Sequence, residues 1–157
     1  MSRKICMYAV AGNTTATDPG GAAAKIDLFH AVTGTLTRIN NGGFTMTPDT
    51  GTGAAHKIEP LQPGLYRITF SCNFYSADDK LTVIFDIRDV ATAIGGTKRE
   101  FETVEGDGAG VDSDLHCFHI EVLAKLTPAS DVCVYLDGDA DATAVCKDAI
   151  LIVEKLD

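Results

Sequence analysis

The chain has 157 residues, 45% of them hydrophobic and 22% charged, so it is long enough for one folded domain and too apolar to be disordered. Its net charge of −9 argues against sequence-independent binding to nucleic acid or to an anionic membrane. No apolar run is long enough to span a bilayer, and residues 5–11 are too short and mixed for the core of a secretory signal.

The first element in chain order is an apolar stretch over residues 4–10. Its side chains fall into two alternating rows: Ile5, Met7 and Ala9, and Cys6, Tyr8 and Val10. Both rows are apolar, so a strand here needs cover on its two faces, which the edge of a sandwich does not provide.

A small, polar, Gly-rich stretch follows up to residue 25, and it leaves two interpretations open. It is either a long loop inside one domain or a flexible joint that lets residues 1–10 act as an arm on a neighbouring subunit. We therefore divide the chain into residues 1–25, an N-terminal arm or first strand plus flexible loop, and residues 26–157, a β-sandwich domain. The arm interpretation predicts that truncating residues 1–12 leaves the domain folded.

A period of two continues along the rest of the chain. In residues 64–75 the even positions are apolar and the odd ones polar, which is typical of a half-buried strand. Alternation or a short apolar run predicts further strands at residues 26–36, 44–47, 81–88, 115–126, 131–136 and 145–153. Gly-rich breaks separate these runs, and no window has the spacing of an amphipathic helix. The sequence therefore predicts an all-β protein, an antiparallel β-sandwich and most simply a jelly roll.

The five cysteines form no CxxC motif, and their odd number does not suit a disulfide framework. Most lie in apolar runs, where a free thiol behaves as a small hydrophobe. We expect five reduced cysteines and folding in a reducing cytoplasm.

The cluster around Cys117 is the strongest candidate for chemistry, because it holds two histidines and a thiol. His116 and His119 point to opposite faces of a strand, so they do not share a metal ion. A cupin-type site needs histidines at i and i+2, whereas the spacing here is three. With no nucleophile elbow or phosphate-binding loop either, we expect no catalytic residue, no cofactor and no enzyme activity.

An acidic turn presents three carboxylates at alternate positions: Asp137, Asp139 and Asp141. This spacing is that of a calcium loop, which makes the three residues weak metal candidates. The glycine and glutamate of such a loop are missing, and no flanking helices are predicted. A solvated turn between two strands without a metal is the favoured interpretation.

Residues 64–70, GLYRITF, resemble the G-x-Y-x-[FI]-x-F strand of the C1q/TNF-like jelly rolls, in which an aromatic-rich strand follows a Pro-Gly turn. The strand at 132–136, the acidic turn and the final run at 149–153 are also similar to that family. The likeness covers residues 55–157. It implies a jelly roll that assembles as a homotrimer, and the same domain is reused in virion proteins of tailed bacteriophages.

From these features we expect a non-enzymatic structural virion protein: a trimeric decoration, or cement, protein on the outer surface of a phage capsid. Its partners would be its own copies and the lattice of the major capsid protein, with no nucleic acid and no membrane. Apolar side chains beyond those needed for one core would make the contacts, and the candidates are Ile5, Met7, Tyr8, Tyr66, Leu123, Cys133 and Tyr135. The alternative is a receptor- or glycan-binding head of a fibre or lectin-like module. A metal-dependent enzyme of cupin type is opposed by the histidine spacing.

Overall fold

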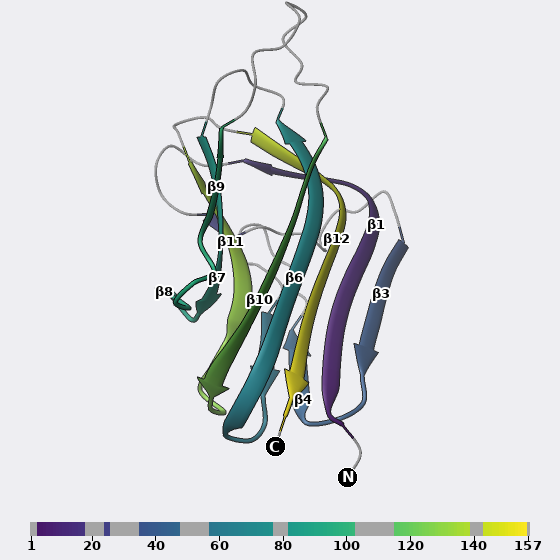
Figure 1. Ribbon diagram of the computed structural model, residues 1–157. Coiled ribbons are helices and arrows are strands. Elements are labelled where there is room, and N and C mark those ends of the chain that lie inside the picture. Colours follow the sequence, from purple (N-terminus) through teal and green to yellow (C-terminus); the bar gives the residue numbers. More distant parts are fainter. Residues whose placement is uncertain are drawn as a thin grey trace, which may run out of the picture.

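The computed structural model describes residues 3–17, 24–25, 35–47, 57–76, 82–102, 115–138 and 143–156. These residues form two antiparallel sheets that face each other, which confirms the predicted all-β sandwich (Figure 1). Sheet A has the strand order β10 (His116–Leu126), β6 (Gly64–Ser76), β12 (Thr143–Lys155), β1 (Ile5–Thr17) and β3 (Thr35–Asn40).

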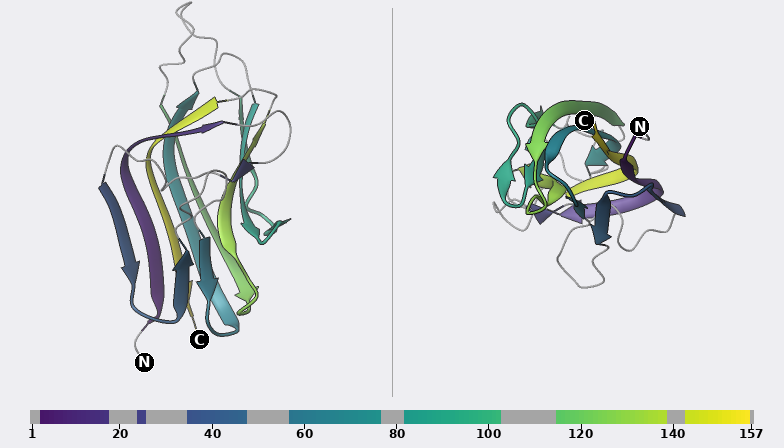
Figure 2. Two further views of the ribbon diagram at one scale, coloured as in Figure 1. Left: turned by 180° about the vertical axis from the view of Figure 1, so that it is seen from behind. Right: turned by 90° about the horizontal axis from the view of Figure 1, so that it is seen from below.

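Sheet B has the order β4 (Phe44–Thr47), β5 (Lys57–Pro60), β11 (Val132–Gly138), β7 (Thr82–Asp89) and β8 (Thr92–Ala93). Two further short strands extend it: β2 (Ala24–Lys25) pairs with β11, and β9 (Arg99–Glu102) pairs with β7. Neighbours in a sheet are mostly distant in sequence, as β1 with β12 and β6 with β12, so long-range pairing dominates the fold (Figure 2).

The core follows the period of two read from the sequence. Along β6 the even positions from 66 to 74 face sheet B and are buried: Tyr66, Ile68, Phe70, Cys72 and Phe74. In β10, Ile120 and Leu126 are buried by the same rule. Edge-to-face and tilted contacts among Phe74, Phe85, Phe101 and Phe118 fill the space between the sheets, with ring centroids 4.6–6.3 Å apart.

Strand β1 lies inside sheet A, between β12 and β3, rather than reaching away from the domain. Cys6 and Tyr8 are fully buried in the core, and burial raises the pKa of each to about 12. Within this one chain, residues 5–17 thus act as a strand of sheet A. The strand also continues to Thr17, well into the stretch that we expected to be a loop.

Two irregularities bend sheet A near the same level. The pairing of β1 with β12 shifts between Ala11 and Thr14, and that of β12 with β6 shifts between Cys146 and Asp148. Extra residues of this kind increase the local twist and turn a strand away from the sheet plane. Figure 1 shows β1 and β12 curving above this level. The described residues include no helix with the length and apolar character needed to cross a membrane.

Candidate interaction surface

The outer face of sheet A, which points away from sheet B, is built in rows that cross the strands. In one row Ile39 pairs with Met7, Met7 with Ile152, Ile152 with Thr69, and Thr69 with Glu121. Side chains directly opposite each other on paired strands lie within contact distance. The next row towards the bulges holds Thr37, Ala9, Ile150, Ser71 and His119 in the same order of strands.

These rows divide the outer face into an apolar and a polar half. The apolar half lies over β3, β1 and β12, and we call it the isoleucine face: Ile5, Met7, Ala9, Ile39, Ile150 and Ile152. Ile39 is 45% exposed, and the other five side chains are partly exposed. A two-layer sandwich buries one face of each sheet, so within the described chain this second apolar layer has no complete cover.

The polar half lies over β6 and β10. Ser71 Oγ and His119 Nδ1 are 2.7 Å apart and share a hydrogen bond, with Asn73 and the exposed Cys117 in the next row. A shallow hollow of about 280 Å³ opens where the pairing of β12 with β1 and with β6 shifts. It is lined by Ala9, Ser71, Cys72, Asn73, Asp148, Ala149 and Ile150. Among the described residues no carboxylate bonds to His119, so the Ser–His pair is not part of a triad.

An ion cluster lies at the lower end of this face, where β1 begins and β12 ends. Glu154 faces outward but is only 2% exposed, because the guanidinium groups of Arg67 and Arg3 cover it. Arg67 Nη2 bonds to Glu154 Oε2, and Arg3 Nε lies 3.4 Å from Glu154 Oε1. The hydrogen bond from Arg67 to this carboxylate raises the pKa of Arg67. Both arginine side chains remain well exposed.

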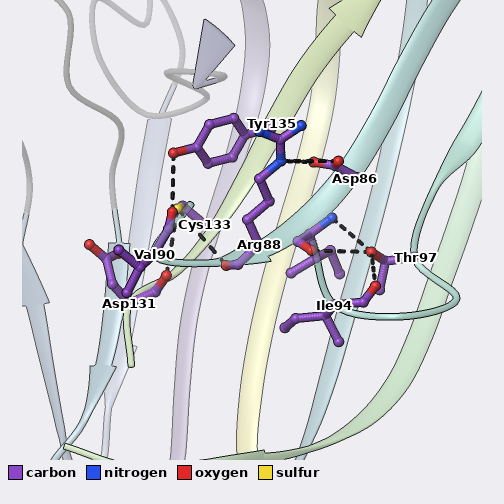
Figure 3. A network of polar contacts seen from close by, with 9 residues as sticks. Asp86, Arg88, Val90, Ile94, Thr97, Asp131, Cys133 and Tyr135 are labelled. Atoms are coloured by element: carbon purple, nitrogen blue, oxygen red, sulfur yellow. Dashed lines mark hydrogen bonds and ion pairs between the residues drawn. The ribbon is translucent and has the colours of Figure 1, made fainter. Parts of the chain in front are cut away.

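The outer face of sheet B also carries apolar residues, but the chain covers them itself (Figure 3). Cys133 is fully buried and Tyr135 is 8% exposed. The Arg88 guanidinium lies 4.3 Å from the centre of the Tyr135 ring, and Tyr135 donates a hydrogen bond of 3.2 Å to the Val90 carbonyl. Arg88 Nε donates to both oxygens of Asp86, at 2.9 and 3.0 Å, and this bond raises the pKa of Arg88.

The predicted contact residues therefore fall into two groups. Tyr8 and Tyr66 lie in the core, Cys133 is fully buried, and the Tyr135 ring lies under the Arg88 guanidinium, so these four side chains offer little exposed surface within the described chain. Ile5 and Met7 belong to the isoleucine face, and Leu123 is 57% exposed on β10, so these three remain candidates.

Sequence reasoning missed the residues that give both faces their character. Ile39, Ile150 and Ile152 join Met7 only through the strand order, which the alternation of one strand does not reveal. Asp86 and Arg88 alternate with the predicted core residues of their strand, and this was the available signal that they lie outward together. Nothing in the sequence pattern indicated that they cover Tyr135.

The histidine and metal predictions concern described residues only in part. His116 stacks on the Phe74 ring with centroids 5.2 Å apart, while His119 points outward, so the predicted opposition of the two is confirmed. Asp139 and Asp141 lie outside the described residues. Within the described ranges, no three His, Cys, Asp or Glu side chains are grouped as a metal site would require.

Comparison with known proteins finds likeness in structure alone. No protein-family model and no curated protein sequence matches the chain. The structure of Eiger TNF from S. frugiperda superposes with a TM-score of 0.56 at 10% identity, over 99% of this chain and 94% of that one. Murine APRIL superposes with a TM-score of 0.58 at 7% identity, over 99% and 100%. The PRD1 vertex protein P5 superposes less closely, with a TM-score of 0.47 at 12% identity, over 98% and 97%. The fold is a TNF-like jelly roll, as the resemblance in residues 64–70 implied.

Proposed function

We propose that the chain is a homotrimeric structural protein of a tailed-phage virion, a decoration protein that binds the outside of the capsid lattice. The observation that carries the self-association is the isoleucine face. Its apolar side chains form a continuous layer across three strands, on the side of sheet A that faces away from sheet B and that no other described strand covers. A contiguous apolar layer of this kind marks a protein contact surface.

In the proposed trimer the isoleucine face packs against a different surface of the neighbouring copy. The isoleucine face of one copy lies beside a polar half, so a copy that uses it against a different surface of its neighbour forms a heterologous contact. A heterologous contact closes into a ring when its rotation matches the number of copies, and three copies is the state that the resemblance implies.

The capsid role rests on the acidic, all-β character of the chain and on its free cysteines, of which Cys6, Cys72, Cys117 and Cys133 are described. A protein that binds only the assembled lattice stabilises it by mass action. Binding would follow if several copies in one ring engage the lattice together, because linked contacts raise the effective affinity.

Light scattering of the purified chain tests the first half of the proposal. We expect the mass of three copies, and the double variant Met7→Ser/Ile152→Ser to give one copy. Leu115→Ser is the matched control, since Leu115 is 50% exposed but lies off the isoleucine face, and it should keep three copies. A wild-type mass of one or two copies contradicts the trimer.

Co-sedimentation tests the second half, with capsids of the phage that encodes the chain, purified without this protein. We expect the trimer to pellet with them and to raise the temperature at which they break open. A trimer that never pellets, at any salt concentration, keeps the self-association but removes the capsid role. That outcome would favour the receptor- or glycan-binding head.

A further inference from the structure

The lower end of sheet A combines exposed leucines with cationic side chains. This end is formed where β1 and β6 begin and where β10 and β12 end, and both termini lie there in Figure 1. Four leucines with 37–57% of their surface exposed gather at it: Leu61, Leu65, Leu123 and Leu156. Leu156 and Leu65 are neighbours across the sheet, because the Leu156 N–H donates to the Leu65 carbonyl.

Five cations accompany these leucines: Arg3, Lys4, Arg67, Lys125 and Lys155. Two described carboxylates lie on the sheet A side of this end: Glu154, which is buried and already held by two arginines, and the exposed Glu121 of β10, which lies close enough to Arg67 to add to the rise in its pKa that Glu154 causes. The exposed charge of the surface is therefore positive, although the whole chain is acidic.

The backbone at this end is held in place before any partner arrives. Asn41 accepts a hydrogen bond from the Ile5 N–H at 2.5 Å and donates one to the Arg3 carbonyl at 2.6 Å. Lys4 donates from Nζ to Gln62 Oε1 at 3.1 Å. A surface whose parts are fixed in the free protein loses little entropy on binding.

Much of the acidic charge of the sequence lies outside this surface. Residues 77–81, 103–114 and 139–142 together hold eight acidic residues and one lysine. A net charge of −9 would oppose a polyanion such as nucleic acid, and leucines offer no ring for bases to stack on.

We infer that the leucine-rich lower end is the surface that docks on the capsid, and that its partner is an acidic protein surface with apolar side chains between the carboxylates. The inference rests on the proposed function and names the contact through which it acts. The leucines supply apolar burial, while Lys125 and Arg3 meet carboxylates of the lattice and steer the approach.

Two variants test this surface, measured as capsid affinity by co-sedimentation over a series of salt concentrations. Lys125→Glu should weaken binding about tenfold at low salt and flatten its salt dependence, since a steering cation becomes a repelling anion. Leu123→Ser should weaken binding about tenfold at every salt concentration, as loss of an apolar anchor does. Lys98→Glu is the control, because it makes the same charge change at an exposed site on sheet B, and it should change affinity less than twofold.

The light-scattering mass of each variant separates this inference from the proposed function. Weaker capsid binding by both variants with three copies intact supports the docking surface. Unchanged binding by Lys125→Glu overturns it, and so does a Leu123→Ser chain that loses its trimer, which would place Leu123 between copies. Larger assemblies of the free wild-type protein at low salt, abolished by Lys125→Glu, would assign the surface to a second copy instead. Wild-type trimer that fails to pellet removes the capsid role and this inference with it.

Discussion

On sheet B the outward Tyr135 ring is covered by the Arg88 guanidinium of the same chain and Cys133 is fully buried, whereas on sheet A the outward Met7 and Ile152 stay partly exposed beside Ile39. In the sequence, β11 of sheet B and β1 and β12 of sheet A all carry apolar residues at both odd and even positions, and so on both faces of the strand. The neighbouring strands make the difference. On sheet B, β7 places the Arg88 side chain over Tyr135, whereas on sheet A, β3 and β12 place Ile39 and Ile152 beside Met7. An apolar second face therefore indicates a partner only where the chain's own side chains leave it open.

Removing β1 is expected to have the largest effect, because this strand contributes to the core with one face and to the isoleucine face with the other. Truncation of residues 1–12 takes the buried Cys6 and Tyr8 out of the core and leaves β12 and β3 without their common neighbour. We expect the truncated chain to lack a cooperative thermal transition by circular dichroism, while removal of residues 1–2 alone leaves the transition in place. A cooperative melt of the shorter chain would support the arm interpretation.

Removing the carboxylate that pairs with Arg88 on sheet B should lower the free energy of unfolding without changing the number of copies. Asp86→Ala leaves the largely buried Arg88 guanidinium without its carboxylate, and we expect a loss of about 2 kcal/mol in the free energy of unfolding by urea. Glu100→Ala is the control, since its contact with Lys98 is exposed and 3.7 Å long, and it should cost less than about 0.5 kcal/mol. A change of mass in Asp86→Ala would show that the outer face of sheet B also meets a copy.

The long strands and the core positions within them could be predicted from the sequence, because the period of two directly reports which residues share a face, whereas the short strands β5 and β9 were not predicted. Residues 64–75 and 115–126 follow it without exception in their buried positions, and the fold class follows from the number of such runs. Alternation does not report which strands are neighbours. Tyr66 was predicted as a contact residue although its own strand pattern placed it with the core residues Ile68 and Phe70.

The outer faces could not be predicted for the same reason. Cys133 pairs with Arg88 across 45 residues of sequence, and Met7 meets Ile152 across almost the whole chain. Such pairings are set by the closure of the sandwich and not by any local preference. The isoleucine face is therefore visible only once both neighbours of β1 are known.

A smaller effect is expected at Val90, whose carbonyl accepts the hydrogen bond from Tyr135 at the edge of the sheet B cover. Val90 has φ 58°, a left-handed conformation that is strained for a β-branched residue. Its side chain is 53% exposed, so Val90→Gly removes the strain with little loss of burial and should stabilise the chain by about 0.5 kcal/mol. Ala91→Gly, next to it but without a positive φ, should destabilise it slightly, and a destabilised Val90→Gly would show that the valine packs against something in solution.

The smallest effect is expected for the partly exposed ion pair between Lys57 and Glu59 on sheet B. Its contribution to stability can be tested by varying the pH. Lys57 Nζ lies 2.9 Å from Glu59 Oε1 and 3.2 Å from Asp131 Oδ2, and its hydrogen bond lowers the pKa of Glu59. A carboxyl whose pKa is lowered on folding adds stability above its unfolded pKa and loses it as the pH falls through the folded value. The same bond raises the pKa of Lys57, so the contribution of Lys57 to stability is lost only at alkaline pH.

Glu59→Gln should therefore cost about 0.5 kcal/mol at neutral pH, because both groups are partly exposed and solvent screens the pair. Its urea midpoint should approach that of the wild type below a pH of about 4, where the wild-type carboxyl is protonated as well. The hydrogen bond from Thr47, 3.0 Å long, can still be accepted by a glutamine amide oxygen. A difference that persists undiminished at acid pH would therefore mean that Glu59 does not act through its charge. The outer face of sheet B would then be held by hydrogen bonds and by the buried Arg88–Asp86 pair alone, which sharpens its contrast with the isoleucine face of sheet A.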